Sequence, residues 1–378
     1  MKRFLYVFEY ADDGSSTVSD ALWNIPQKIL SKRLENKNKP VEFNFARGLF
    51  HKYTKNGTSL IRLVNFIWMH ISALFVLMFY RPDFVFVRTT PPMIQITYSI
   101  LGNLFGAKVY IWLMDYHPVF ESRICGENLI KKFIVGLFDR LDRFGLSKVD
   151  AVVCLDQAME ELIKSRFVNV RTVVCPTFAL GKSIFTDLRK VDPDTISLLY
   201  SGNLGIGHNL KRFERFIKKL SAKKRVIISY CGNSHLAQDR FSKLCVDAGA
   251  EFKKYPFVKD YSKLGSFYKE NGFDYGVVLL NDELKGVVSP SKFTGYISFG
   301  LPIISITPKG TNSDFVCKKF GAGISINEES DLDAAIDVIT ESRIQTIFAA
   351  NTRFCLNYFG QDAIKNIVDF FENEINNI

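Results

Sequence analysis

The chain has 378 residues, of which 47% are hydrophobic and 23% charged, and its formal net charge is +10. This length and hydrophobic content supply two cores, which excludes a disordered chain and a single small domain. The seven cysteines are odd in number and show no C-x-x-C spacing. They argue against a disulfide framework and a zinc site, and favour reduced thiols in a cytoplasm.

The positive net charge limits the classes of partner that the protein is expected to bind. Basic pairs such as Lys218-Lys219 and Lys318-Lys319 recur along the chain. Such a surface attracts nucleic acid, an anionic membrane or small anionic substrates. No helix-turn-helix, zinc-finger or RNP-type pattern accompanies the charge, so we expect no nucleic-acid partner. Charge alone does not choose between the other two.

Two apolar segments in the first half need interpretation. The run Phe4–Phe8 ends before Glu9 and is too short for a signal peptide, so we interpret it as a buried strand. The segment Phe66–Tyr80 has fifteen residues and contains His70, whereas a bilayer span needs roughly 20. We expect a buried or surface-seated helix here, and favour a core helix over a membrane anchor.

Buried strands alternate with amphipathic helices along the chain, a pattern typical of parallel α/β sheets. The strands predicted in the first half are Phe4–Phe8, Phe84–Val87, Val109–Trp112, Ala151–Cys154 and Thr172–Val174. The helices predicted there are Ser19–Arg33, Ser59–Phe79, Met93–Phe105, Leu129–Leu146 and Ala158–Arg166. After an irregular segment, Pro176–Pro193, the second half restarts with strands Ser197–Tyr200, Val226–Cys231, Tyr275–Leu280 and Pro302–Ile306 and helix Leu210–Ala222.

The restart predicts two Rossmann-like domains that face each other across a cleft. We place an N-terminal domain at residues 1–180 and a C-terminal domain at 190–360, joined by the irregular segment as a linker. A last helix, 361–378, carries Ile364, Ile367, Val368, Phe371 and Ile375 along one face. It is long enough to dock onto either domain, including by crossing back to the first.

A glycine-rich loop in the second half follows a predicted strand and precedes a basic helix. It has the sequence Tyr200-Ser-Gly-Asn-Leu-Gly-Ile-Gly-His208. Glycines let a ligand approach the backbone closely, and the helix start that follows favours anions. The loop matches neither the dinucleotide fingerprint nor the Walker motif. Phosphate contact and an ordinary tight turn are both consistent with it.

The segment Val288–Ile304 predicts a turn, a short helix with an apolar face and a buried strand. Ser289 or Ser291 can cap this helix, and Pro290 suits its first turn. Lys292 adds a full positive charge to the helix start, and such a corner holds a phosphate or diphosphate. A capped β-loop-α unit without a ligand shows the same pattern. Together with the glycine-rich loop, however, this corner could grip one diphosphate.

Two segments of the first half are further candidates. The loop Ala11–Thr17 contains Gly14 and Ser15 and would face the ligand of the second domain across a cleft. Asp115 and His117 follow a predicted strand at its carboxyl end, where they could orient or deprotonate an acceptor hydroxyl. A solvated or hydrogen-bonded turn is the alternative for both segments. No histidine spacing indicates a metal site.

Four motifs now fall into a recognisable order: Thr89-Thr-Pro-Pro-Met93, Asp115-Tyr-His-Pro118, Leu199-Tyr-Ser-Gly-Asn-Leu-Gly205 and Ser289–Ile304. In this order they resemble the GT-B glycosyltransferases of family 4, especially the branch that builds bacterial surface polysaccharides such as O-antigen and capsule. The resemblance covers about residues 4–360. It implies a retaining, metal-independent transferase of hexosyl or N-acetylhexosaminyl type, with a nucleotide sugar as substrate, UDP-sugar being favoured, and no cofactor.

The resemblance also implies roles for residues. Donor contacts are expected from Gly14, Ser15, Gly202, Asn203, Leu204, Gly205, Phe257, Val258, Ser289, Pro290, Ser291 and Lys292. Among these, Lys292 would stabilise charge on the leaving phosphate, and Phe257-Val258, after a buried Tyr255, would seat the nucleobase. Asp115 and His117 would meet a glycan or polyprenyl-linked acceptor. The implied location is the cytoplasm, with peripheral attachment to the inner membrane face left open.

Two departures from the family pattern keep other functions open. The glutamate that usually binds the ribose hydroxyls is replaced by Gly295, with Asp282 and Glu283 one loop earlier as substitutes. The family's acidic residue after "W-P" is Val119 here. A non-catalytic partner subunit of a glycan-assembly complex is therefore an alternative. A sugar-nucleotide epimerase is a second one.

Overall fold

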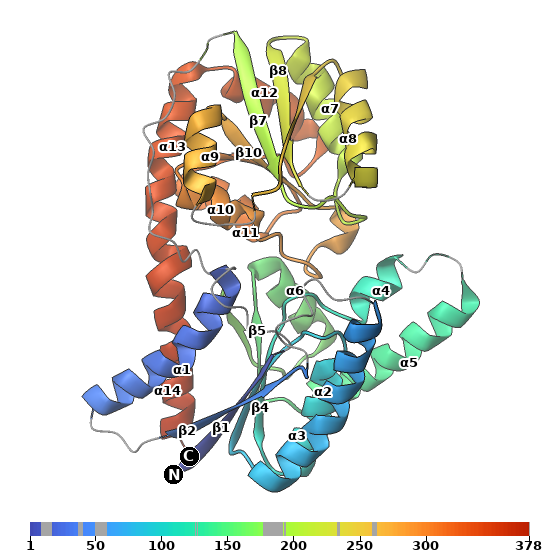
Figure 1. Cartoon of the computed structure of the whole chain (residues 1–378), viewed down its shortest axis with the longest axis vertical. Helices are drawn as coiled ribbons and strands as arrows, with labels where there is room; N and C mark the ends of the chain where they lie inside the picture. The colour runs from blue at the N-terminus through green and yellow to red at the C-terminus, as the bar shows by residue number, and fades with distance from the viewer. Residues whose placement is uncertain are drawn as a thin grey trace. The chain divides into compact units, whose positions relative to one another are not determined.

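The computed structural model describes residues 1–8, 17–36, 41–49, 59–124, 126, 128–176, 192, 194–232, 235–258 and 263–377. The chain divides into two compact units (Figure 1). The first unit comprises Met1–Pro176, Gly286–Ser289 and Ala363–Ile378, and the second comprises Thr177–Lys285 and Pro290–Asp362.

The first unit is built on a parallel six-stranded sheet in the order β2-β1-β3-β4-β5-β6. Its strands are β1 (Lys2–Phe8), β2 (Val41–Arg47), β3 (Phe84–Arg88), β4 (Lys108–Trp112), β5 (Ala151–Cys154) and β6 (Thr172–Val174). Its helices are α1 (Thr17–Glu35), α2 (Ser59–Tyr80), α3 (Ile94–Leu104), α4 (Val119–Ile124), α5 (Leu129–Leu146) and α6 (Gln157–Arg166). Helix α3 packs between α2 and α5 (Figure 1).

The last helix, α14 (Ala363–Asn376), returns to the first unit and packs beside α1. Its apolar face is buried as predicted, and Phe371 meets Phe4 edge-on with ring centroids 5.3 Å apart. Glu374 accepts a 2.7 Å hydrogen bond from the hydroxyl of Tyr110 on β4. The chain therefore crosses back after the second unit is complete.

The second unit has the strand order β12-β11-β10-β7-β8-β9, also fully parallel. Its strands are β7 (Thr195–Ser201), β8 (Arg225–Cys231), β9 (Glu251–Tyr255), β10 (Tyr275–Leu279), β11 (Ile303–Ile306) and β12 (Gly323–Ser325). Its α-helices are α7 (Leu210–Ser221), α8 (His235–Asp247), α9 (Leu264–Asn271), α10 (Lys292–Ser298), α11 (Asn312–Phe320), α12 (Leu332–Ile339) and α13 (Ser342–Asn357). This is the doubly wound order, and it reverses direction between β7 and β10, where such sheets bind ligands.

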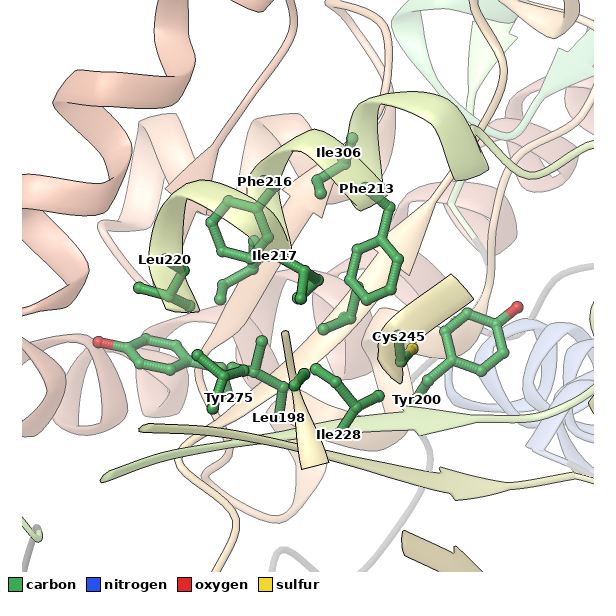
Figure 2. Close-up of a cluster of buried hydrophobic side chains, with 14 of the residues drawn as sticks. Leu198, Tyr200, Phe213, Phe216, Ile217, Leu220, Ile228, Cys245, Tyr275 and Ile306 are labelled. Atoms are coloured by element: carbon green, nitrogen blue, oxygen red, sulfur yellow. The ribbon is translucent and has the colours of Figure 1, made fainter. Parts of the chain in front are cut away.

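The core of the second unit lies on both faces of its sheet. On one face, α7 places Phe213, Phe216, Ile217 and Leu220 against the strands, at the i, i+3, i+4, i+7 spacing of an amphipathic helix (Figure 2). Strand residues alternate, so Leu198 and Tyr200 face this cluster while Leu199 faces the other one. Helix α10 belongs to the second cluster, through the fully buried Phe293, Tyr296 and Ile297.

The predicted fold class, α/β with two Rossmann-like units, is confirmed. The six described cysteines are free and buried, as expected for reduced thiols. The segment Phe66–Tyr80 lies in a surface-seated helix, one of the two expected placements, and not in a core helix. Helix α2 buries only one stripe and leaves its other apolar face exposed, because it covers the outside of the first unit rather than its centre. The predicted linker lies almost wholly outside the described residues.

Candidate functional site

The sheet of the second unit opens at its carboxyl edge between β7 and β10. Only Leu198 and Leu199 of β7 pair with β10, so the last residues of the two strands diverge. The hydroxyl of Tyr296 fills the gap: it accepts a 2.8 Å hydrogen bond from Ser201 N–H and lies 3.4 Å from the carbonyl of Val277. Its ring packs on Gly276, where a β-carbon would lie 2.4 Å from the ring. The packing of Tyr296 on Gly276 therefore keeps the two strands apart at this edge.

The glycine-rich loop starts at this opening. Gly202 has φ +107°, a conformation that side chains rarely adopt, and its N–H donates to the carbonyl of Cys231 at 2.7 Å. A β-carbon on Gly202 would lie 2.8 Å from Cε of Lys292. The glycine thus lets the lysine of α10 lie directly on the loop. The structure brings together the two segments that were expected to share a diphosphate.

Lys292 is the central side chain of this site. Its ammonium donates to the hydroxyl of Tyr200, to the carbonyl of Asn203 at 3.2 Å and to Nε2 of His208 at 3.1 Å. It also lies 4.2 Å from the centre of the Tyr200 ring. Nδ1 of His208 accepts a 2.8 Å hydrogen bond from Gly205 N–H and lies 2.9 Å from the carbonyl of the same residue, so the imidazole is held by the glycine-rich loop.

The electrostatics of the site favour an incoming anion. Burial lowers the pKa of Lys292 to about 7, and no carboxylate of the described residues pairs with it. Burial and the neighbouring Lys292 charge lower the pKa of His208 to about 4, so this imidazole is neutral near pH 7. A buried cation without a counter-charge is costly. A bound phosphate would supply the missing negative charge.

A cavity of about 770 Å³ opens next to this group, at the ends of β7 and β10. Its lining includes Leu204 and Gly205 of the predicted donor residues, together with His208, which also contacts Lys292. The opposite wall is formed by residues 281–283, so both acidic residues proposed as substitutes for the family glutamate line the cavity. Arg212 holds this wall through two hydrogen bonds to Asp282, of 2.6 and 3.2 Å.

Several predicted details of the α10 corner differ. Ser291 occupies the N-cap position in a right-handed helical conformation, and its side chain makes no capping hydrogen bond, so the predicted Ser291 cap is not seen. Ser289 belongs to the segment Gly286–Ser289, which groups with the first unit, whereas Pro290 and Ser291 belong to the second. The full positive charge of the corner is that of the Lys292 side chain.

The predicted nucleobase segment follows the edge strand β9. Tyr255 is half-buried rather than buried, because it closes β9 at the rim of the second cluster. Val258 packs against that cluster, and Phe257 is 41% exposed. The thiol of Cys231 donates to the carbonyl of Pro256 at 3.2 Å, which ties this segment to the end of β8. The candidate residues Gly14 and Ser15 lie outside the described residues.

The acceptor-side candidates lie in the first unit, after β4. Asp115 is exposed and forms an antiparallel bridge with Val288, while Tyr116 N–H donates to the carbonyl of Val287 at 2.8 Å. His117 is half-buried and its Nδ1 is hydrogen-bonded to Glu121 of α4. Glu121 was not among the predicted site residues, although its place one helical turn after His117 is a readable signal.

The buried carboxylate of Asp142 supports the loop that follows β4. Asp142 of α5 is fully buried and accepts hydrogen bonds from the hydroxyl of Tyr116 at 2.8 Å and from Nε2 of Gln95 at 3.2 Å. The same Gln95 nitrogen donates to the carbonyl of His117 at 2.7 Å. Burial outweighs these bonds and raises the pKa of Asp142 to about 7. The network fixes the backbone that presents Asp115 and His117.

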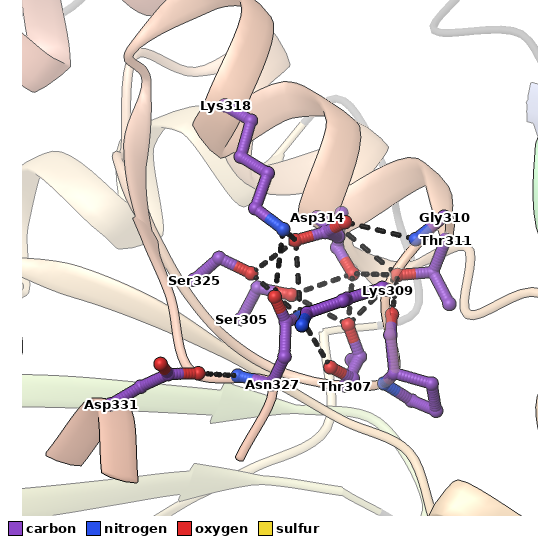
Figure 3. A network of polar contacts seen from close by, with 12 residues as sticks. Ser305, Thr307, Lys309, Gly310, Thr311, Asp314, Lys318, Ser325, Asn327 and Asp331 are labelled. Carbon is purple, nitrogen blue, oxygen red and sulfur yellow. Dashed lines mark hydrogen bonds and ion pairs between the residues drawn. The ribbon is translucent and has the colours of Figure 1, made fainter.

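A second polar network, also missed from the sequence, follows β11 (Figure 3). Asp314 of α11 accepts from Gly310 N–H at 2.9 Å, from the hydroxyl of Ser325 at 2.6 Å and from Lys318 at 2.8 Å. Burial alone would raise the pKa of Asp314, but these donors outweigh it and hold the pKa below its ordinary value. Because its groups satisfy one another, the network anchors the loop after β11 rather than leaving a ligand group open.

A doubly wound sheet with a glycine loop and a lysine at its topological switch point is a setting in which phosphorylated ligands bind at the strand ends. No protein-family model matches this chain, and no curated protein matches its sequence. Solved structures do match its fold, and they include glycosyltransferases. The fold that they share with this chain is the GT-B fold.

Three of these structures illustrate the likeness. Sucrose-phosphate synthase (tll1590) from Thermosynechococcus elongatus matches with TM-score 0.64 and 12% identity over 99% of each chain. Anabaena Alr3699/HepE in complex with UDP matches with TM-score 0.60 and 12% identity over 100% of each chain, and its UDP-glucose complex matches with TM-score 0.60. The lipopolysaccharide outer core galactosyltransferase WaaB matches with TM-score 0.59 and 11% identity over 98% of this chain and 99% of its own. Identities this low establish the fold and not the reaction.

Proposed function

We propose that this chain is a glycosyltransferase that moves a sugar from a nucleotide-sugar donor to a glycan or polyprenyl-linked glycan acceptor in surface polysaccharide synthesis. One observation carries the proposal. Lys292 lies at the switch point of a doubly wound sheet, against a glycine loop and without a carboxylate partner among the described residues. A cation kept in this setting matches the diphosphate of a nucleotide sugar.

The donor is proposed to be a UDP-sugar of hexosyl or N-acetylhexosaminyl type. Support comes from the fold shared with Alr3699/HepE, which is described in complexes with UDP and UDP-glucose. The diphosphate would replace one or more of the three acceptors of the Lys292 ammonium. As the bond to the sugar breaks, charge develops on the leaving phosphate, and a fixed ammonium in a partly dry site stabilises it without a metal ion.

The acceptor hydroxyl is proposed to meet Asp115 and His117. The hydrogen bond from Nδ1 of His117 to Glu121 would fix the imidazole with Nε2 toward the acceptor, an arrangement suited to a general base. Retention of the anomeric configuration and a cytoplasmic location complete the proposal, and both rest on the family resemblance.

Turnover of a donor panel tests the proposal. The purified chain is incubated with UDP-, GDP-, CMP- and ADP-sugars, each with free and polyprenyl-linked oligosaccharide acceptors. We expect release of one nucleoside diphosphate that depends on the acceptor, survives chelation of divalent metals and is lost in Lys292→Met. No turnover and no binding of any donor would refute the proposal.

A non-catalytic partner subunit is the second candidate, favoured by Gly295 at the position of the family's ribose-binding glutamate. Such a subunit would bind nucleotides weakly and associate stably with an active transferase, whereas turnover by the isolated chain would exclude it. A sugar-nucleotide epimerase is distinguished by its products. It would change the donor sugar without an acceptor, while a transferase would at most hydrolyse the donor slowly.

A further inference from the structure

Helix α2 has one face packed and one face exposed. Its buried residues, Asn65, Met69, Ala73 and Leu77, recur every four positions, and the ring of His70 is hydrogen-bonded to Thr97 of α3 at 2.6 Å. The opposite face is apolar and in contact with solvent. It consists of Leu60, Leu63, Val64, Ile67, Trp68, Ile71, Leu74, Phe75, Met78 and Phe79, which are 37–75% exposed.

Helix α5 carries a second exposed apolar surface. Between Leu129 and Leu137 every side chain is exposed except that of Val135, which is half-exposed, and Figure 1 shows this helix extending away from the sheet of its own unit. Its exposed large apolar residues are Leu129, Ile130, Phe133, Ile134, Leu137, Leu141 and Phe144. Most of these follow the spacing of a single helical stripe.

The two surfaces belong to one side of the first unit, because α3 packs between α2 and α5. The second unit differs: its exposed large apolar residues, among those the structure describes, are Ile206, Val246, Phe257, Ile347 and Phe354, which are scattered over several elements. Contiguous apolar surface of this kind marks an interaction site, whereas scattered residues need no explanation.

The charges around this surface select the partner. Along α2 the one charged side chain is that of Arg62, and α5 exposes Lys131, Lys132, Arg140 and Arg143. The acidic residues of α5 are turned inward: Asp142 is buried, and Asp139 is half-buried and paired with Arg143 and Arg166. Apolar side chains bordered by lysine and arginine, whose stems can lie along the lipid while their charges reach the headgroups, suit an anionic bilayer surface.

We propose that the first unit binds the surface of an anionic lipid bilayer through the exposed apolar faces of α2 and α5. The helix pair would lie in the interface rather than cross it. By length and composition α2 could span a bilayer, and only 22% of its most apolar window is buried in the protein. Crossing, however, would require α2 to leave α3 and to carry Asn65, His70 and Ser72 into hydrocarbon.

This inference does not depend on the donor chemistry, although it would bring a polyprenyl-linked acceptor to the enzyme. The test is flotation with vesicles of phosphatidylcholine, alone or with about one third phosphatidylglycerol. We expect binding to the anionic vesicles that weakens with salt. It should come with a blue shift of tryptophan fluorescence that is lost in Trp68→Phe.

Matched variants locate the surface. Phe75→Ser with Phe79→Ser on α2, and Phe133→Ser with Leu137→Ser on α5, should each weaken vesicle binding about tenfold or more, because each pair loses apolar area from the lipid. The control is Ile347→Ser with Phe354→Ser on α13, also exposed but in the second unit, and it should bind like the wild type. UDP-induced thermal stabilisation should be the same in all of them.

Four results would overturn the proposal. The first is no binding to anionic vesicles, and the second is binding that none of the α2 and α5 variants weakens. The third is resistance of the bound protein to alkaline extraction, which indicates a spanning helix. The fourth is a concentration-dependent dimer that these variants abolish, which indicates a second copy on this surface. If UDP does not stabilise the wild type, the proposed function is contradicted, whereas the proposal of membrane binding is unaffected.

Discussion

The ammonium of Lys292 lies 3.1 Å from Nε2 of His208, and the two residues are 84 positions apart in the sequence. Lys292 opens α10, and His208 ends the glycine-rich loop after β7. A neutral imidazole can accept a hydrogen bond from the lysine and adds no charge. Below the pKa of Lys292 the site therefore holds one positive charge and no carboxylate among the described residues to neutralise it, and a bound anionic substrate would supply the missing negative charge.

Replacing this lysine is expected to stabilise the free protein. In the folded state burial lowers the pKa of Lys292 to about 7. Near neutral pH the unfolded chain therefore binds the proton more tightly than the folded one. Lys292→Met should raise the free energy of unfolding by roughly 0.5–2 kcal/mol, since functional sites trade stability for activity. Denaturant titration near pH 7 measures this, with Lys309→Met at an exposed ion pair as control. A clear loss of stability would show that the lysine is structural.

Nucleotide affinity is expected to fall as pH rises above the pKa of Lys292. Below about 7 the ammonium is already formed in the free protein, and above this value binding must first return a proton. The decline should approach about tenfold per pH unit, with proton uptake on binding. Calorimetric titration between about pH 6 and pH 9, in buffers of different ionisation enthalpy, measures both quantities. Lys292→Arg should remove the dependence, because arginine stays charged. A decline that persists in this variant would assign it to another group.

The glycine-rich loop offers a matched pair of substitutions. Gly202→Ala places a β-carbon 2.8 Å from Cε of Lys292 at a φ of +107°, so it should displace the lysine, weaken nucleotide binding about tenfold or more and cost about 1 kcal/mol of stability. Gly205→Ala meets no atom nearer than 4.0 Å and should bind almost normally. Equal effects of the two substitutions on nucleotide binding would argue against contact between the loop and the lysine in solution.

The stability of the first unit should fall as pH rises from about 4 to 7 through Asp142. Its pKa is raised by burial to about 7, so in this window the folded protein holds a proton that the unfolded chain releases. The slope should reach at most about 1.4 kcal/mol per pH unit. Asp142→Asn should flatten this decline. Asp139→Asn should leave it in place, because hydrogen bonds from Arg143 and Arg166 overcome the effect of burial and lower the pKa of Asp139. Chemical unfolding across this range distinguishes the two.

A carboxylate restored at position 295 should strengthen donor binding. A β-carbon there has only the hydroxyl of Tyr268 within 4 Å, at 3.9 Å, so a β-carbon can be added without a clash. Under the proposed function Gly295→Glu should bind the nucleotide more tightly than the wild type. Gly295→Ala controls for the gain of about 1 kcal/mol in helix stability from removing a glycine. An equal affinity change in both variants would show that the missing carboxylate is irrelevant here.

Strands in the interior of the sheets were predictable, whereas three of the four edge strands were not; the fourth, β6, has the predicted bounds. The three strands missed from the sequence, β2, β9 and β12, all lie at sheet edges. The sequence of β9, Glu-Phe-Lys-Lys-Tyr, shows why: an edge strand is half-solvated and carries charges that block further pairing, so it lacks an apolar run. Strand β5 and helix α5, by contrast, have the predicted bounds, because burial at β5 and capping by Asn128 at α5 are written in local sequence.

The site was predictable to the level of loops but not of side-chain contacts. Gly202 and Lys292 could be associated because the carboxyl ends of parallel strands share one edge. The partners of Lys292 could not be foreseen, since Tyr200 and His208 stood only as the ends of the glycine-rich loop and their contacts depend on how the two strands diverge. The exposed face of α2 was likewise hidden, because an apolar helix of a core and one of an interface have similar composition.

The most direct test of the central claim is a titration of UDP and UDP-sugars into the wild type and Lys292→Met, followed by calorimetry and by thermal unfolding. The wild type should bind, and ligand at about 100 times its dissociation constant should stabilise it by roughly 2.7 kcal/mol. The Lys292→Met variant should be folded and, without ligand, at least as stable as the wild type. It should show neither binding nor stabilisation when UDP or a UDP-sugar is added. Equal binding by both proteins would contradict the claim that Lys292 holds the donor diphosphate.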